Sequence, residues 1–138
     1  MTSELRRQSL TFHLAPSSGV PPYLQVVRQV EQALRIGALR PGDRLPTVKE
    51  VVAEIAINPN TVSRAYRELE QAGLVEGRQG VGTFVIARPT GPPPETHTRL
   101  AKTLRQWVTT ARAEGLADQA IESLMHDVLT QLDDEETA

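Results

Sequence analysis

The sequence predicts a mainly α-helical fold of the α+β class, and three observations lead to this prediction. Apolar residues recur at helical spacing in five separate segments of the chain. Two of these segments lie a few residues apart, and each begins with residues that cap helices. A glycine-rich polar turn between two short apolar runs follows them, which is the pattern of a β-hairpin. Together they predict an N-terminal winged helix-turn-helix followed by a short C-terminal two-helix hairpin.

Length and composition are those of a soluble globular protein. With 138 residues, of which 39% are apolar and 23% charged, the chain has room for one domain, or for a small domain with an appendage. No stretch approaches the roughly eighteen apolar residues of a membrane span, and residues 1–10 lack the apolar core of a signal peptide. We therefore expect a cytoplasmic protein that does not enter a membrane.

The sequence predicts no metal site and no cofactor. It contains no cysteine, which excludes disulfides, thiolate chemistry and cysteine-rich zinc sites. The three histidines, His13, His97 and His126, lie far apart and have no ligand at metal-binding spacing. We expect an exposed or a packing role for each of them.

The formal net charge of −2 hides a division along the chain. Residues 1–90 carry eleven Lys or Arg against eight Asp or Glu, a net charge of +3, whereas residues 91–138 carry four against nine, a net charge of −5. A slightly basic front part is consistent with contact to nucleic acid, although the excess is small. The acidic end is expected to stay away from phosphates.

The elements before the helix pair can be taken in chain order. Alternating apolar and polar residues from Gln8 to Ala15 predict a short strand. An apolar stripe at helical spacing predicts a helix from Tyr23 to Ile36, ended at Gly37. Residues 39–46 contain adjacent Pro and Gly and predict a turn with a brief extended stretch around Arg44 and Leu45.

Two capped helices follow closely. Thr47 and Glu50 match a capping box, which starts a helix that ends near Ala56. Asn58 is a preferred N-cap and Pro59 stands at the first position of the next helix, which runs to Gln71. Two such helices with apolar stripes that can share a core are typical of a helix-turn-helix.

The second helix of this pair has an outward face suited to DNA. Its inward stripe consists of Val62, Ala65, Tyr66 and Leu69, and about 180° away lie Asn60, Arg64, Arg67 and Gln71. Amide and guanidinium groups hydrogen-bond base edges and phosphates, so this helix is a candidate recognition helix, with Asn60 and Arg64 on base edges and Arg67 on phosphate. The alternative is an ordinary solvated helix face.

A hairpin over residues 74–86 completes the winged helix as its wing. Gly80 and Gly82 permit close approach to a sugar-phosphate backbone, and Arg78 can reach a phosphate or a narrow minor groove. The alternative is that both glycines serve only the turn.

Residues 89–96 are rich in proline and predict a stiff linker between a winged-helix domain at 8–88 and a two-helix tail at 97–133. An isolated helical hairpin of this size cannot bury both apolar stripes, so we expect a homodimer through the tail. Packing of the tail onto the winged helix is the alternative. The expected dimerisation residues are Leu100, Leu104, Trp107, Val108, Ile121, Leu124, Met125 and Val128.

Several runs of residues resemble the GntR family of bacterial transcription regulators, and its YtrA subfamily in particular. The resemblance covers about residues 10–90 and rests on the segments 39–50, 58–66, 70–75 and 80–84. It implies a winged-helix DNA-binding domain, a dimer on a near-palindromic operator in double-stranded DNA, and repression, often of a neighbouring transporter operon.

The resemblance also implies DNA-contact positions. Lys49 matches the basic residue of the second helix of the domain, and Gly80 matches the wing-tip glycine. The chain departs from many family members at Ser63, where they carry Arg, and at the uncharged Val81. With the contacts inferred from the residues themselves, the expected DNA-binding set is Lys49, Asn58, Asn60, Thr61, Ser63, Arg64, Arg67, Arg78, Gln79 and Gly80.

Other functions are weighed against this one. A winged helix that binds another protein is the alternative to DNA reading. An enzyme is not expected, because fewer than fifty residues follow the linker and they hold a single lysine, Lys102, without a catalytic constellation. A small-molecule effector is possible but unsupported, since one chain leaves no room for an enclosed pocket; a cavity around Trp107 at a dimer interface stays open.

Overall fold

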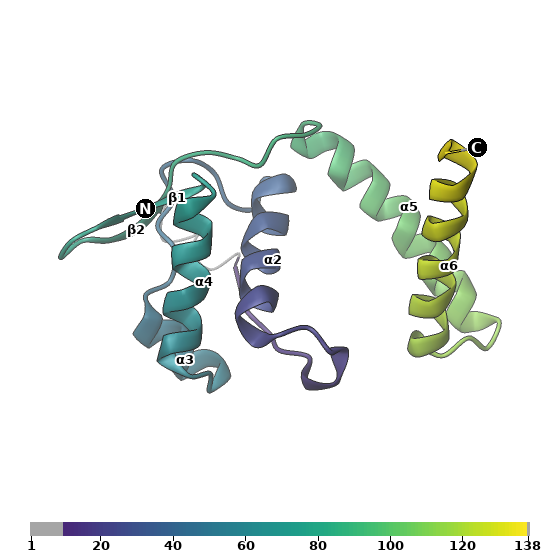
Figure 1. The fold of residues 1–138 in the computed structure, drawn as a ribbon, viewed down its shortest axis with the longest axis horizontal. Helices are drawn as coiled ribbons and strands as arrows, with labels where there is room; N and C mark the ends of the chain where they lie inside the picture. Colours follow the sequence, from purple (N-terminus) through teal and green to yellow (C-terminus); the bar gives the residue numbers. More distant parts are fainter. Residues whose placement is uncertain (1–9, 138) are drawn as a thin grey trace. The chain divides into compact units, whose positions relative to one another are not determined.

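The computed structural model describes residues 10–137, and it divides into two compact units between His97 and Thr98. The first unit contains a short 3-10 helix η1 (Pro16–Ser18), the helices α2 (Pro22–Arg35), α3 (Val48–Ile55) and α4 (Pro59–Gln71), and the strands β1 (Val75–Arg78) and β2 (Gly82–Val85) (Figure 1). The helix α5 (Pro94–Ala113) leads into the second unit, which also contains α6 (Asp118–Thr137). The predicted winged helix-turn-helix and two-helix hairpin are confirmed.

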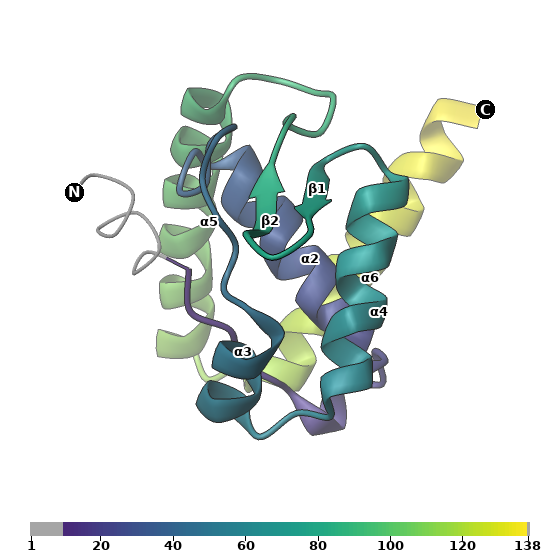
Figure 2. The ribbon, with the colours of Figure 1, turned by 90° about the vertical axis from the view of Figure 1, so that its left-hand side faces the viewer.

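The core of the first unit lies between α2, α3 and α4. Figures 1 and 2 show α2 and α4 side by side, with α3 at one end of α4. The predicted inward stripe of α4 is buried, and it packs with Val26, Val30 and Leu34 of α2 and with Val51 of α3. Helical spacing of apolar residues therefore located both the helices and the faces that they bury.

The strand predicted from Gln8 to Ala15 is absent over its described part, residues 10–15, while Gln8 and Ser9 lie outside the described residues. The segment is extended and buries Leu10 and Phe12, as the alternation suggested. Its backbone N–H groups bond to side chains instead of to a strand: Phe12 N donates to Glu54 Oε1 at 2.9 Å and Ala15 N donates to Gln25 Oε1 at 2.8 Å. Side-chain acceptors on helices thus replace a neighbouring strand.

The wing is an antiparallel hairpin in which Val75 pairs with Val85 and Arg78 with Gly82. The loop before α3 is tied to it, because Leu45 N donates to Thr83 O and Val85 N donates to Asp43 O, each at 2.8 Å. The extended stretch predicted around Arg44 is thereby confirmed, and it forms a bridge with Phe84. These bonds fix the root of the wing against the start of α3.

The second unit is a helical hairpin latched at its turn. Arg112 donates from Nε and Nη2 to the two carboxylate oxygens of Asp118, at 2.8 and 2.9 Å. Ala111 and Ile121 are buried beside this turn, and the acidic end of the chain to Thr137 belongs to α6. The helix α5 begins at Pro94, inside the segment expected to be linker, because proline suits the first turn of a helix.

Two further properties concern residues 10–137 only. No helix among them is both long enough and apolar enough to span a membrane. No group of three or more His, Cys, Asp or Glu in the same range could hold a metal ion.

Candidate nucleic-acid interface

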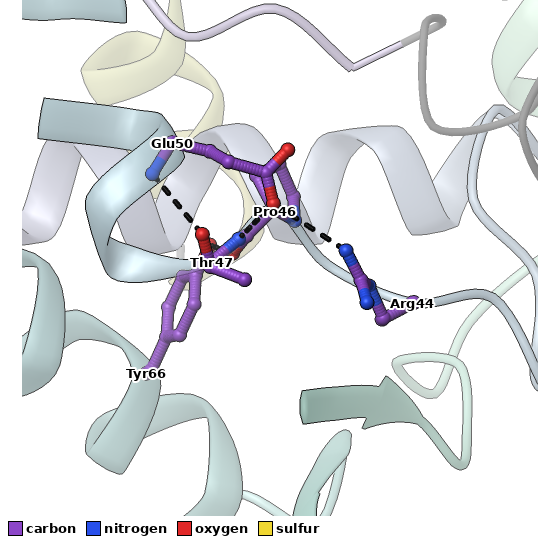
Figure 3. A network of polar contacts seen from close by, with 5 residues as sticks. All are labelled: Arg44, Pro46, Thr47, Glu50 and Tyr66. Carbon is purple, nitrogen blue, oxygen red and sulfur yellow. Dashed lines mark hydrogen bonds and ion pairs between the residues drawn. The ribbon is translucent and has the colours of Figure 1, made fainter. Parts of the chain in front are cut away.

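The first turn of α3 is held by a capping box, and Lys49 lies exposed within it. Glu50 N donates to Thr47 Oγ1 and Thr47 N donates to Glu50 Oε1, both at 3.1 Å (Figure 3). Arg44 Nη2 lies 3.4 Å from the same Glu50 oxygen. The predicted capping box is confirmed, and it fixes the backbone from which Lys49 extends into solvent.

Tyr66 connects α4 to this turn. Its hydroxyl is buried and donates to the carbonyl oxygen of Pro46 at 2.6 Å (Figure 3). Burial raises the pKa of the Tyr66 phenol above its ordinary range, and the negative charges of Glu50 and Glu54 raise it further. The phenol therefore stays neutral and keeps donating, which holds α4 against the segment that starts α3.

The N-terminus of α4 is capped as the sequence predicted. Asn58 Oδ1 accepts a hydrogen bond from Asn60 N at 2.8 Å, and Pro59 occupies the first turn. The side-chain oxygen of Asn58 is thus used by the backbone, whereas the carboxamide of Asn60 is exposed. Thr61 and Ser63 are half-buried at the edges of the exposed face.

The outward face of α4 carries two arginines in different surroundings. Arg64 places its guanidinium carbon 3.7 Å from the centre of the Tyr23 ring on α2. Arg67 is exposed, and its side chain makes no hydrogen bond, ion pair or ring contact with any residue between 10 and 137. The two side chains are therefore not equivalent, although the sequence places both on the same face.

The wing presents Gln79, Gly80 and Val81 at its exposed tip, and Gly80 has a φ of 76°. Arg78 lies over the Phe84 ring at 4.5 Å, and its Nη2 is 3.5 Å from Glu76 Oε2. A groove of about 510 Å³ lies between the wing and Thr47 and is lined by residues 77–83. Lys49 lies on α3 and the groove on the wing, and α3 and strand β1 of the wing both pack against α4.

The comparisons with known proteins identify the family. Residues 22–85 match the model of the bacterial regulatory proteins of the gntR family. The chain is 40% identical over 110 residues to the HTH-type transcriptional regulator Rv1152 of Mycobacterium tuberculosis, a match that covers 79% of this chain and 87% of that protein. The chain belongs to the GntR family.

A further relative and a solved structure are also similar to the chain. The chain is 44% identical over 70 residues to the HTH-type transcriptional repressor YtrA of Bacillus subtilis, which covers 51% of this chain but only 54% of YtrA. A solved structure described as a transcriptional antiterminator from Listeria monocytogenes superposes with a TM-score of 0.55 at 26% identity, over 86% of this chain and 89% of that one. GntR proteins are regulators rather than enzymes, in agreement with the sequence-based expectation.

Two residues beside this candidate interface were missed by sequence reasoning. Tyr23 was assigned to a buried stripe, and its contact with Arg64 joins residues 41 positions apart. Arg44 was assigned only to a brief extended stretch within a turn, yet its Cδ lies 3.1 Å from the position that a Cβ on Gly82 would occupy, and its buried Nε has no hydrogen-bond partner among residues 10–137. The sequence could have indicated the contact between Arg44 and Gly82 only if the register of the hairpin had been known.

Proposed function

We propose that the protein is a dimeric, sequence-specific DNA-binding repressor that acts in the cytoplasm on a near-palindromic operator close to the genes it controls, often a transporter operon. The observation that carries this proposal is the exposed polar face of α4, which is held by the Asn58 cap at one end and by the Tyr66 hydrogen bond along its side. A helix presented in this way is suited to enter the major groove.

The groups bordering α4 suit the sugar-phosphate backbone. Lys49 extends from a fixed first turn, and Gly80 at the wing tip leaves room for close approach. Phosphate contacts of this kind set the register of a protein on the duplex, while base contacts supply specificity. The amide of Asn60 is exposed near the helix N-terminus, where recognition helices approach base edges.

Dimerisation is proposed through the apolar face of the second unit. A groove of about 570 Å³ between α5 and α6 is lined by Leu104, Trp107, Leu124, Met125, Val128 and Leu129. Leu100 is also exposed and Val108 is half-buried, whereas Ile121 is already buried inside the hairpin. An exposed face of this size on a two-helix unit suits a second copy of the chain.

The charges of α5 and α6 also favour a second copy of the chain as the partner of this apolar face. The helix α5 carries four basic residues and one acidic residue, a net charge of +3, whereas α6 carries seven acidic residues and no Lys or Arg, a net charge of −7. Opposite charges favour contact between α5 of one copy and α6 of the other, and like charges disfavour the pairing of α6 with α6.

The test is a fluorescence-anisotropy titration of the protein against double-stranded DNA from upstream of its own gene, at several salt concentrations. We expect affinity for one site well above that for unrelated DNA, with a log–log salt slope of roughly −0.9 for each phosphate contacted. Lys49→Ala should weaken binding to all sequences alike and reduce the slope by about one contact. Arg28→Ala, an exposed arginine outside the DNA-binding set, is the matched control. Binding without site preference and without salt dependence would favour a protein-interaction module.

A further inference from the structure

We propose that the two outward arginines of α4 divide the work of recognition: Arg67 reads a base edge, and Arg64, held on the ring of Tyr23, contacts the sugar-phosphate backbone. Tyr23 is then the positioning residue of Arg64. This inference rests on the proposed DNA-binding function. It reverses the roles that helical spacing alone suggested for the two arginines.

Spacing cannot separate the two side chains. At about 100° per residue, the buried stripe of α4 centres between Val62 and Ala65. Arg64 lies about 30° to one side of the direction opposite to this centre, and Arg67 lies about 30° to the other side. Both are exposed, and both are long enough to reach into a groove. Their surroundings have to decide which of them faces the bases.

Arg64 is drawn to the α2 side of the helix. Its guanidinium stacks on the face of Tyr23 at 3.7 Å, and Tyr23 is half-buried and packed against the hydrophobic core. Stacking on an anchored ring restricts the guanidinium to one side of α4 and leaves the N–H groups along its edge free to donate. A donor held beside the recognition helix faces a wall of the groove, which is formed by phosphates.

Arg67 lies on the opposite half of the exposed face. This half is the wing side, because Glu70 on the same side of α4 accepts a hydrogen bond from Gly77 N of β1 at 3.0 Å. Since side chains on a helix lean towards its N-terminus, Arg67 extends over Ser63 and towards Asn60. Ser63 is small and leaves that path open, and no residue in the described part of the chain holds the Arg67 guanidinium.

The experiment selects sequences from a pool of randomised double-stranded DNA with the full-length wild type and with each variant, and then measures salt-dependent anisotropy on the selected sites. Arg67→Ala should abolish the preference at one base pair, with a roughly tenfold loss of discrimination there and an unchanged salt slope. Arg64→Ala should select the same consensus as wild type, bind every site more weakly and lose about one phosphate contact from the slope.

Variants of Tyr23 test its positioning role through the salt slope of DNA binding, which a purely structural role would leave unchanged. Tyr23→Leu should reproduce the reduced salt slope of Arg64→Ala, and combining the two should reduce it no further, whereas Tyr23→Phe keeps the ring face and the wild-type slope. Circular dichroism checks whether Tyr23→Leu folds. If Tyr23→Leu does not fold, the comparison of Arg64→Ala with Arg67→Ala still tests the division of roles. A changed consensus for Arg64→Ala, or an unchanged one for Arg67→Ala, overturns this division of roles. If the wild type selects no sequence, the proposed function itself fails.

Discussion

At the scale of single residues, Tyr66 joins α4, the proposed recognition helix, to the loop before α3 through one buried hydrogen bond. Tyr66→Phe removes the donor and leaves the carbonyl of the buried Pro46 without it. We expect a loss of about 1–3 kcal/mol in the free energy of unfolding, measured by urea denaturation at pH 7. Tyr23→Phe is the matched control, because the Tyr23 hydroxyl has no hydrogen-bond partner among residues 10–137. An equal effect of both substitutions would contradict the stabilising role of the hydrogen bond between Tyr66 and Pro46.

The raised pKa of Tyr66 also predicts a pH dependence. Since the folded state binds the phenolic proton more tightly than the unfolded chain, this group contributes its full stability below the unfolded pKa of about 10 and loses it as the pH rises beyond that value. The free energy of unfolding of the wild type should therefore fall more steeply above pH 10 than that of Tyr66→Phe. Parallel curves for the two proteins would show that this phenol does not titrate with folding.

At the scale of elements, the wing depends on how Arg44 packs against its second strand. Gly82→Ala places a Cβ 3.1 Å from Arg44 Cδ, so the Arg44 side chain has to shift, and it forces alanine into a φ of +141°. Backbone strain of this kind costs on the order of 1–3 kcal/mol, and the displacement adds to it. Gly91→Ala is the matched control, because its φ is also +141° but no atom lies within 4 Å of the added Cβ. Denaturation midpoints should fall further for Gly82→Ala; an equal or smaller fall would show that the Arg44 contact is dispensable.

The elements that the sequence predicted well are those whose causes are local. The capping box at Thr47, the cap at Asn58 and the buried stripe of α4 are each formed by residues no more than seven positions apart, and all three are present. The segment 10–15 shows the limit of such reasoning. Its alternation was correct, but a strand also needs a partner edge, and the acceptors that replaced that edge come from Gln25, Gln29 and Glu54.

The candidate interface was predictable as an exposed surface, but the roles proposed for its residues were not. Exposure of Asn60, Arg64 and Arg67 follows from the helical period alone. The stack of Arg64 on Tyr23 depends on how α2 and α4 pack, which no local spacing encodes. Ile121 illustrates the same limit in the second unit, because the latch between Arg112 and Asp118 closes the hairpin turn beside it.

At the scale of the whole molecule, DNA reading and dimerisation depend on each other in the proposed function. One recognition helix meets only a few base pairs, and two of them meet half-sites about one helical turn, roughly 34 Å, apart. Joining two such contacts in one dimer makes the second binding event intramolecular, which raises affinity without any new contact. The apolar face of α5 and α6 therefore matters for operator binding even though it touches no DNA.

This dependence predicts that Leu129→Glu separates the copies. Leu129 is 63% exposed and lines the apolar groove, so a carboxylate there has to lose its water in the dimer. The substitution also adds negative charge to α6, which is already strongly acidic. Sedimentation equilibrium at micromolar concentration should give a dimer for the wild type and a monomer for the variant. Gln131→Glu is the matched control, since it adds the same charge about 200° around α6. The variant should lose affinity for a full operator and keep the affinity of the wild type for an isolated half-site. A dimer that survives Leu129→Glu would place the interface elsewhere, and a monomeric wild type would remove the basis for a palindromic operator.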